Sequence, residues 1–316
     1  MKPTITVITP TRNRSRTLKR VFNSLQKQTY KKFEWIVCDD SSNDNSLTLL
    51  KNFKKKANFK IRIYHFKERA GKPKIDNFCV KKAKGNFIVF ADSDDAFKKN
   101  SFFDLIEEWH RIPSHIKKKI FAIITRVQTP CGKPLEEKLN INSQSVSLTN
   151  LWHKYNKKKE KWLFIKKSIL LKYSFLEIDY YVPEGILWEK ISLKYNVWIL
   201  DKCYRIFYND THNSITHSKK IKYPIGQLES LKMQIRKYNK KKLSIKKIKH
   251  YIIYYRYFFI NNLFLNNKSK DKIFLSYSIK LIYKSFGFIL FCKDFLSQNI
   301  HNEKFKKNLS HPSEIQ

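Results

Sequence analysis

Phe87-Ile88-Val89-Phe90-Ala91-Asp92-Ser93-Asp94-Asp95 joins an apolar run, typical of a buried strand, to three carboxylates. Acids so close together repel one another unless a cation lies among them. A hard divalent metal that bridges a diphosphate is such a cation, so the stretch indicates a nucleotide or sugar-nucleotide site. The alternative is a polar loop in which Asp92 or Ser93 caps a helix that begins near Ala96.

Two upstream segments repeat this arrangement. Residues 4–13 read as a β-branched strand that breaks at Pro10 and is followed by a helical pattern. Residues 33–38 read as a second buried strand, followed by the acidic stretch 39–44 and another helix. Strands that alternate with helices predict a mainly parallel sheet, with ligands at the carboxyl ends of its strands. We therefore expect five carboxylates to converge on one crevice: Asp39, Asp40, Asp92, Asp94 and Asp95.

The first hundred residues resemble the nucleotide-binding half of family 2 glycosyltransferases with the GT-A fold. The matching elements occur in order at residues 8–13, 28–30, 39–44, 85–88 and 92–95. The resemblance implies an α/β GT-A fold, Rossmann-like, with a mainly parallel sheet flanked by helices. It also implies transfer of a sugar from a nucleotide donor, with Mg²⁺ or Mn²⁺ as cofactor and inversion at the anomeric carbon.

The same resemblance divides the chain into three regions. Residues 1–100 correspond to the half of the GT-A domain that binds the nucleotide-sugar, and residues 101–215 to the half that binds the acceptor. Residues 216–316 are expected to form a helical, basic and aromatic C-terminal extension.

Roles in donor binding follow from the resemblance position by position. Thr9, Pro10 and Arg12 lie where the first loop of the family wraps the nucleobase and ribose. Asp40 matches the carboxylate that accepts a hydrogen bond from the base, a contact that favours uracil and hence a UDP-sugar. Asp39 is expected to support that loop.

The acidic motif after residue 91 is expected to bind ribose and metal. Asp92, next to Ser93, matches the acid that meets the ribose or a metal-bound water, and Asp94 and Asp95 match the metal ligands. The metal would act as a Lewis acid on the departing diphosphate. Lys72 falls where family members contact the donor, although a basic loop in a basic protein explains it equally well.

An inverting transferase also needs a base that takes the proton of the acceptor hydroxyl. The best candidate is Glu184, near the start of a predicted helix. Many family members carry Glu-Asp here, whereas this chain has Glu184-Gly185, which leaves Asp179 and Glu189 as rivals. A first-turn acid that favours the helix dipole is an equally good interpretation of Glu184.

Residues 197–201 and 204–208 resemble the closing strands of the family, which precede a polar loop over the diphosphate. In this loop, residues 209–214, His212 is a candidate third metal ligand or phosphate donor; the alternative is an exposed loop histidine. Five scattered cysteines without C-x-x-C spacing indicate neither a disulfide framework nor a zinc site. No signal peptide precedes the first strand, so we expect a cytoplasmic enzyme.

The net charge of +39 is carried mainly by lysine. In the tail, residues 248–259 and 273–295 combine a broad apolar face with flanking lysines, which suits the surface of an anionic bilayer. No apolar stretch reaches the length of about 18 residues that a membrane span requires. We expect peripheral attachment to the inner face of the cytoplasmic membrane; the alternative is that these faces pack on the catalytic domain.

Three functions are compared. A basic nucleic-acid-binding protein would have no use for five carboxylates at strand ends, because they repel phosphate, so we expect no nucleic-acid partner. An inverting glycosyltransferase that extends a lipid-linked or surface glycan, of the bacterial polysaccharide or lipopolysaccharide type, explains them. A polyprenyl-phosphate sugar synthase is second, weakened by the absence of C-terminal membrane spans. The sequence leaves open whether the protein forms a homo-oligomer.

Overall fold

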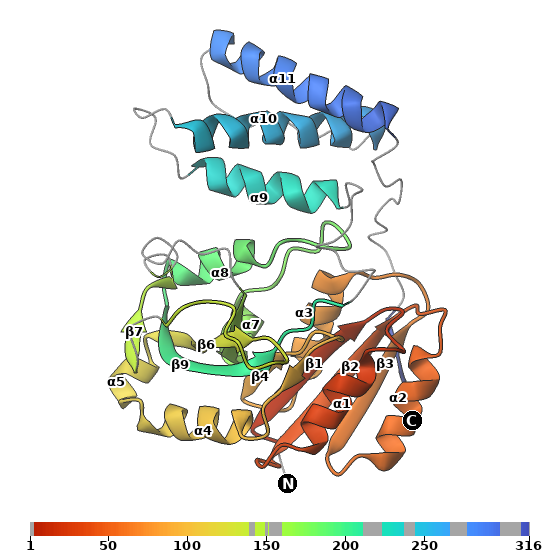
Figure 1. Ribbon diagram of the computed structural model, residues 1–316, viewed down its shortest axis with the longest axis vertical. Helices are drawn as coiled ribbons and strands as arrows, with labels where there is room; N and C mark the ends of the chain where they lie inside the picture. Colours follow the sequence, from red (N-terminus) through yellow and green to blue (C-terminus); the bar gives the residue numbers. More distant parts are fainter. Residues whose placement is uncertain are drawn as a thin grey trace. The chain divides into compact units, whose positions relative to one another are not determined.

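The chain forms two compact units in a computed structural model (Figure 1). Unit 1 contains Met1–Phe175, Leu187–Thr211 and Leu309–Gln316, and unit 2 contains Leu176–Ile186 and His212–Asn308. The structure describes residues 3–138, 143–148, 151, 160–210, 223–236, 244–265, 277–297 and 311–315.

The amino-terminal part of unit 1 is a parallel sheet whose strands are joined by helices. Its strands lie in the order β3-β2-β1-β4, and each neighbouring pair is parallel. The strands are β1 (Ile5–Thr11), β2 (Phe33–Asp40), β3 (Lys60–Phe66) and β4 (Phe87–Phe90). The connecting helices are α1 (Leu18–Gln26), α2 (Ser46–Lys56) and α3 (Lys72–Lys82).

The rest of the sheet is mixed. β8 (Lys161–Lys166) runs antiparallel between β4 and β6 (Ile120–Gln128), and β9 (Asn196–Ile206) is parallel to β6. β1, β2, β4, β6 and β9 therefore end at one edge of the sheet, where β8 begins. The short strands β5 (Ala96–Phe97) and β7 (Gln144–Val146) pair antiparallel with β9.

Three local expectations differ from the structure. The first strand does not break at Pro10, because β1 continues to Thr11. No helix begins near Ala96: β5 lies there, and α4 (Ser101–Arg111) follows it. Residues 197–201 and 204–206 belong to one strand, β9, which ends at Ile206 and pairs with β6 through several register shifts. The described residues of this part of the chain form three further helices: α5 (Ser114–Lys117), α7 (Lys167–Lys172) and α8 (Gly185–Ser192), the last of which begins in unit 2 and ends in unit 1.

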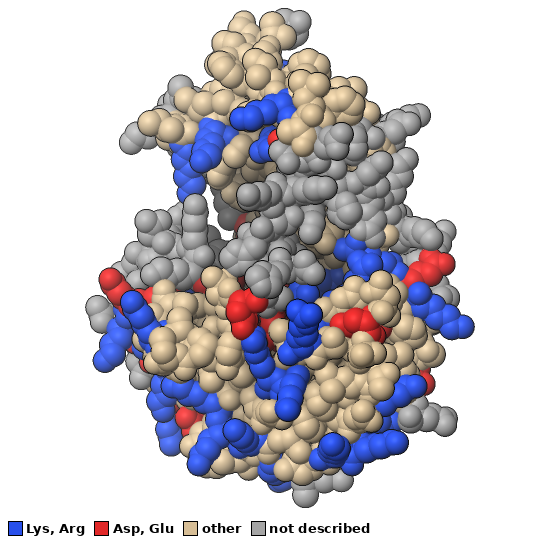
Figure 2. Space-filling view, turned by 45° about the vertical axis from the view of Figure 1, so that its right-hand side comes forward, with Lys and Arg blue, Asp and Glu red and all other residues tan. Residues whose placement is uncertain are grey.

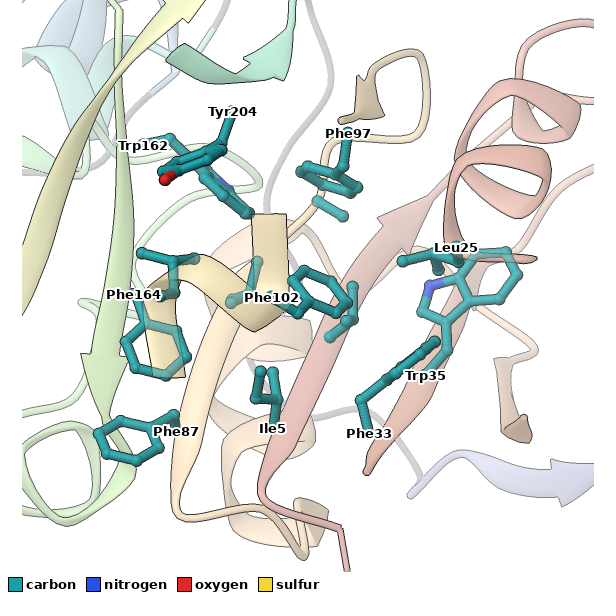
Figure 3. Close-up of a cluster of buried hydrophobic side chains, with 14 of the residues drawn as sticks. Ile5, Leu25, Phe33, Trp35, Phe87, Phe97, Phe102, Trp162, Phe164 and Tyr204 are labelled. Atoms are coloured by element: carbon teal, nitrogen blue, oxygen red, sulfur yellow. The ribbon is translucent and has the colours of Figure 1, made fainter. Parts of the chain in front are cut away.

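Both faces of the sheet are buried, which explains the continuous apolar runs of its strands. Every residue of β2 is buried. Figure 3 shows the cluster on one face, where Ile5, Trp35, Phe87 and Phe102 come from β1, β2, β4 and α4. Cys38 packs on the other face, and all five cysteines are free thiols.

Gly85 lets the chain approach β1 before β4 begins. A Cβ at this position would lie 2.6 Å from the carbonyl carbon of Ile5 and 2.6 Å from the amide nitrogen of Thr6. The amide of Gly85 donates to Thr6 Oγ1 at 2.9 Å. A side chain here would push β4 away from β1, and with it the acidic motif that β4 carries.

Near residue 313 the chain returns to the sheet. β10 (Ser313–Ile315) pairs antiparallel with β3 and covers the edge of the parallel part. These residues follow unit 2 in the sequence, so the long segment of unit 2 is joined to unit 1 at both of its ends.

Unit 2 is helical, as predicted for the C-terminal region. It contains α9 (Pro224–Arg236), α10 (Ile245–Phe259), the π-helix η2 (Ile260–Phe264) and α11 (Tyr277–Leu296). In the part of the chain that the structure describes, each helix is too short or too polar to cross a membrane.

Candidate active site

The two carboxylates at the end of β2, Asp39 and Asp40, are buried and accept hydrogen bonds from backbone amides. Asp40 accepts hydrogen bonds from the amides of Ala70 at 2.5 Å and Gly71 at 3.1 Å. Gly71 has a φ of +84°, a left-handed conformation that glycine adopts without strain. Burial raises the pKa of Asp40, against the opposing effect of these two amides and of Arg69 and Arg12. The structure thus places Asp40 at the predicted edge, where it holds the loop before α3.

Asp39 organises the loop after β2. It accepts hydrogen bonds from the amide and hydroxyl of Ser42 and lies 3.0 Å from Nδ1 of His65. Ser42 Oγ in turn accepts from the amide of Asn13 at 2.9 Å, and Asn13 Oδ1 accepts from the amide of Asn43 at 3.0 Å. These bonds join the loops after β1 and β2, which are the two loops assigned to the nucleotide.

The residues predicted in the first loop have different environments. Thr9 is fully buried, and its hydroxyl accepts a hydrogen bond from Trp35 Nε1 at 2.9 Å, so its side chain belongs to the core. Pro10 is half-buried at the end of β1, and Arg12 is exposed just beyond it. Of the three side chains, that of Arg12 has the most access to a ligand at this edge.

The acidic motif after β4 is organised by an arginine from β9. The buried guanidinium of Arg205 donates through Nε to Asp95 and through its terminal nitrogen to Asp92 at 2.5 Å. The other terminal nitrogen of Arg205 lies 3.7 Å from the carboxylate of Glu160, just before β8. Asp95 also accepts from the amide of Tyr208 at 3.2 Å. A cation does lie among the acids, and the protein itself supplies it.

The carboxylates that share Arg205 differ in exposure and in pKa. The side chain of Asp92 is 42% exposed, whereas that of Asp95 is 1% exposed. Desolvation opposes ionisation of Asp92, but the charges of Arg205 and Lys72 outweigh it and lower the pKa. Burial raises the pKa of Asp95 to about 7, although Arg205 opposes the shift. Asp92 is therefore ionised and open to solvent, while Asp95 holds the motif to β9.

Asp94 and Ser93 face α1. Thr17 Oγ1 donates to the carbonyl of Ser93 at 2.9 Å, and Arg20 donates to the carbonyl of Asp94 at 3.4 Å. Arg20 also forms a bidentate pair with Asp210, at 2.7 and 2.5 Å. The side chain of Asp94 is half-buried. The backbone of the motif is thus fixed from α1 and from the segment after β9.

Lys72 lies at the first turn of α3. Its ammonium contacts Asp76 at 2.8 Å and lies 5.4 Å from the ring centroid of Phe90, the last residue of β4. These contacts bring Lys72 to the same edge as Asp92, whose pKa it helps to lower.

The three candidate bases lie in the segment 179–189. Asp179 caps α9: its carboxylate accepts from the amides of Ile225 at 3.1 Å and Gly226 at 3.2 Å. This buried role is structural. Glu184 is half-buried in unit 2, and Glu189 is half-buried in the part of α8 that belongs to unit 1. His212 lies outside the described residues.

The described carboxylates and histidines form no preassembled set of three metal ligands. Asp94 and Asp92 nevertheless suit Mg²⁺, which keeps several waters and is held by one or two carboxylates together with substrate phosphates. The partly exposed, ionised carboxylate of Asp92 fits that mode. The contacts of Asp95 with Arg205 and Tyr208 direct its carboxylate away from such a role, and its assignment as a ligand stays a prediction.

Arg205, Arg20, Asp210 and Glu160 were not predicted as site residues. Arg205 and Arg20 contact the acidic motif directly, Glu160 contacts it through Arg205, and Asp210 contacts it through Arg20. The one signal in the sequence was a charged residue inside an apolar strand, Arg205, because a buried arginine requires acidic partners.

Known protein families and proteins resemble this chain. The model of the family "Glycosyl transferase family 2" matches residues 6–170, more than half of the chain. The poly(ribitol-phosphate) β-N-acetylglucosaminyltransferase TarS of Staphylococcus aureus is 36% identical over 119 residues, covering 36% of this chain and 20% of TarS. The chain therefore spans about a fifth of the length of that relative.

Two further similarities extend over more of the chain. The GalNAc(5)-diNAcBac-PP-undecaprenol β-1,3-glucosyltransferase of Campylobacter jejuni is 26% identical over 240 residues, 73% of this chain and 74% of that enzyme. A crystal structure of S. aureus TarS 1–349 in complex with UDP-GlcNAc superposes with a TM-score of 0.61 at 17% identity, covering 99% of both chains. The latter confirms the predicted GT-A fold, and with the family match it shows that this chain belongs to glycosyl transferase family 2.

Proposed function

We propose that this protein is an inverting glycosyltransferase, which moves a sugar from a UDP-sugar to a hydroxyl of a lipid-linked or surface glycan. The observation that carries the proposal is the acidic motif Asp92–Asp95, held by Arg205 at the edge where the loops after β1 and β2 meet. Ligands bind at this edge in open α/β sheets.

The proposed donor site uses the two joined loops for the nucleoside and the acidic motif for the diphosphate. Arg12 is exposed at the first loop, and Asp39 and Asp40 fix the second. TarS, which has this fold, is known in complex with UDP-GlcNAc, which supports a UDP-sugar here.

The proposed metal is Mg²⁺ or Mn²⁺, held by Asp94 with Asp92 beside it. When bound, such an ion neutralises the charge that develops on the departing diphosphate. Arg205 has a separate task, because it keeps Asp92 ionised and fixes Asp95 to β9. Lys72 adds a positive charge at the same edge.

Glu184 is proposed as the base that accepts the proton of the acceptor hydroxyl. Asp179 is less suited to that role, because both of its carboxylate oxygens accept hydrogen bonds from backbone amides. Glu189 remains the rival.

The acceptor is proposed to be a glycan attached to a lipid at the inner face of the cytoplasmic membrane. Relatives from C. jejuni and Escherichia coli are named as glucosyltransferases that act on undecaprenol-diphosphate-linked glycans. Their names favour glycan extension over synthesis of a polyprenyl-phosphate sugar.

The test is a donor screen with purified protein. UDP-glucose, UDP-N-acetylglucosamine and GDP-mannose are each incubated with Mn²⁺ or with EDTA, and release of nucleoside diphosphate is measured. We expect hydrolysis of at least one UDP-sugar with the metal and none with EDTA. Equal rates in EDTA would contradict the metal, and inertness toward all three donors, with no binding of UDP, would contradict the function.

A further inference from the structure

α11 carries an apolar face that the described residues of its own unit leave exposed. The exposed large apolar side chains of this helix are Ile279, Leu281, Ile282, Phe286, Phe288, Ile289, Phe295 and Leu296. Ile282, Phe286 and Ile289 are 53%, 53% and 61% exposed and follow one another at i, i+4 and i+7, so they form one stripe. An apolar surface of this extent marks a contact with a protein, a ligand or a membrane.

The opposite face of α11 is held firmly against α10. The rings of Tyr251 and Tyr283 stack with centroids 5.2 Å apart, and Arg256 forms a bidentate pair with Asp294 at 2.5 and 2.6 Å. A Cβ on Gly287 would lie 2.5 Å from Tyr255 Cβ, so the two helices are in close contact there. α11 is therefore fixed in its rotation, with its apolar stripe on the outer side.

The charge of unit 2 indicates the kind of partner that this face would meet. Lys293 is exposed on α11, and Lys246 and Lys249 are exposed on α10. Between residues 212 and 308 the only acidic residues in the sequence are Glu229, Asp271, Asp294 and Glu303, and Asp294 is paired with Arg256. Figure 2 shows α11 as a largely tan surface with blue side chains near it in unit 2.

A bilayer with anionic lipids matches both properties. An amphipathic helix of this kind lies in the interface with its apolar side chains inserted, while lysines at its edges meet the lipid phosphates. A second copy of the chain fits less well, because two basic surfaces would face each other across a symmetric interface.

We propose that α11 is a membrane-binding helix, which inserts the stripe Ile282, Phe286 and Ile289 into an anionic bilayer. The biological role of this binding rests on the proposed function, because an acceptor attached to a membrane lipid requires the enzyme to work at the membrane surface. The binding itself needs neither donor nor acceptor, so it is tested separately.

The experiment compares the full-length protein with a triple variant, Ile282→Ser, Phe286→Ser and Ile289→Ser. Cosedimentation is measured with vesicles of phosphatidylglycerol and phosphatidylcholine in equal parts, at low and high salt. The matched control carries Phe103→Ser, Leu171→Ser and Leu193→Ser, three exposed apolar positions of unit 1. Release of UDP from a UDP-sugar in solution is measured for each protein.

We expect the triple variant to lose vesicle binding by at least about tenfold, since each large side chain contributes when it leaves water. The control should bind like the wild type, and UDP release should be unchanged in both. Binding of the wild type to vesicles should weaken as the salt concentration rises, because salt screens the attraction of the lysines. The part of the binding that comes from the apolar side chains should persist at high salt. The proposal is overturned if the triple variant sediments like the wild type, or if it only converts a dimer to a monomer. Failure of UDP release in the wild type would instead count against the proposed function.

A single substitution tests the same proposal if the three serine substitutions disturb the fold of the protein. Phe286→Trp preserves an aromatic side chain at the stripe, and Phe103→Trp serves as its control in unit 1. Because the chain already has six tryptophans, the emission of the wild type is subtracted from that of each variant. Addition of the same vesicles should shift the difference spectrum of Phe286→Trp to shorter wavelength and leave that of Phe103→Trp unchanged. Equal spectra with and without vesicles at position 286 would overturn the proposal.

Discussion

Units 1 and 2 differ in how they use charged and apolar side chains. In unit 1 the carboxylates at the sheet edge have close partners: backbone amides for Asp40, and the shared guanidinium of Arg205 for Asp92 and Asp95. In unit 2 the described helices contact one another through aromatic rings, and a row of apolar side chains stays exposed on α11. Unit 1 thus concentrates acids where a ligand is expected, whereas unit 2 presents apolar surface. A single charge should matter most in unit 1, and packing should matter most in unit 2.

The largest effect is expected from Asp94→Asn. We expect transfer to fall about a thousandfold or more, because charge stabilisation by a metal is worth several kcal/mol. UDP binding should also lose its sensitivity to EDTA, as measured by calorimetry. Glu137→Gln, which removes an exposed acid from the same unit, should leave both properties unchanged. Full activity of the Asp94 variant would show that the motif does not hold the metal.

Glu184→Gln should lower the transfer rate by about two to four orders of magnitude while donor binding stays nearly the same. The measurement is single-turnover transfer at saturating donor. Asp179→Asn is the comparison: it weakens the cap of α9, so it should lower the melting temperature more than the rate per folded molecule. A near-normal rate for the Glu184 variant would move the role of base to Glu189.

Gly287→Ala tests the packing of unit 2. The added Cβ would meet Tyr255, and overpacking of this kind costs about 1–3 kcal/mol. We expect a lower melting temperature for the helices of unit 2, followed by circular dichroism, with unchanged UDP binding. Ser285→Ala, at an exposed position of the same helix, should have little effect. A neutral result for Gly287→Ala would mean that α10 and α11 are not in close contact.

The smallest effect is a pH dependence of stability that arises from Asp95. Because the pKa of Asp95 is raised to about 7, the native state keeps a proton between about pH 4 and about pH 7 that the unfolded chain releases. The contribution of Asp95 to the free energy of unfolding therefore falls as pH rises through this window. Asp95→Asn removes that slope, so its melting temperature should rise relative to wild type from about pH 5 to about pH 8. A constant difference would contradict the raised pKa.

The sequence predicted those features of unit 1 that depend on local pattern. Apolar runs that end in acids located β2 and β4, and their alternation with helices predicted parallel neighbours. Arg205 escaped prediction because its partners Asp92 and Asp95 lie more than a hundred residues away, and nothing local to β9 reveals them. The same limit applies to the pair between Arg20 and Asp210.

Candidate roles were hardest to judge where a polar side chain can serve either the structure or the chemistry. Asp179 matched the position of a base, yet its carboxylate caps a helix that begins at Pro224. Thr9 matched a donor-binding loop, yet its hydroxyl bonds to Trp35 in the core. In both cases the deciding partner is distant in sequence, so residue type and spacing alone were insufficient.

The pairing of β10 with β3 has a consequence for biosynthesis. Ribosomes deliver the chain from its amino end, and domains generally begin to fold in that order. The backbone groups on the outer side of β3 therefore wait for residues 313–315 until all of unit 2 has been translated. During that interval β3 is an unprotected edge, at which nascent chains can pair with one another. A deletion that starts after residue 211 would make this exposure permanent, so an internal excision of residues 212–308 that spares β10 is the better way to remove unit 2.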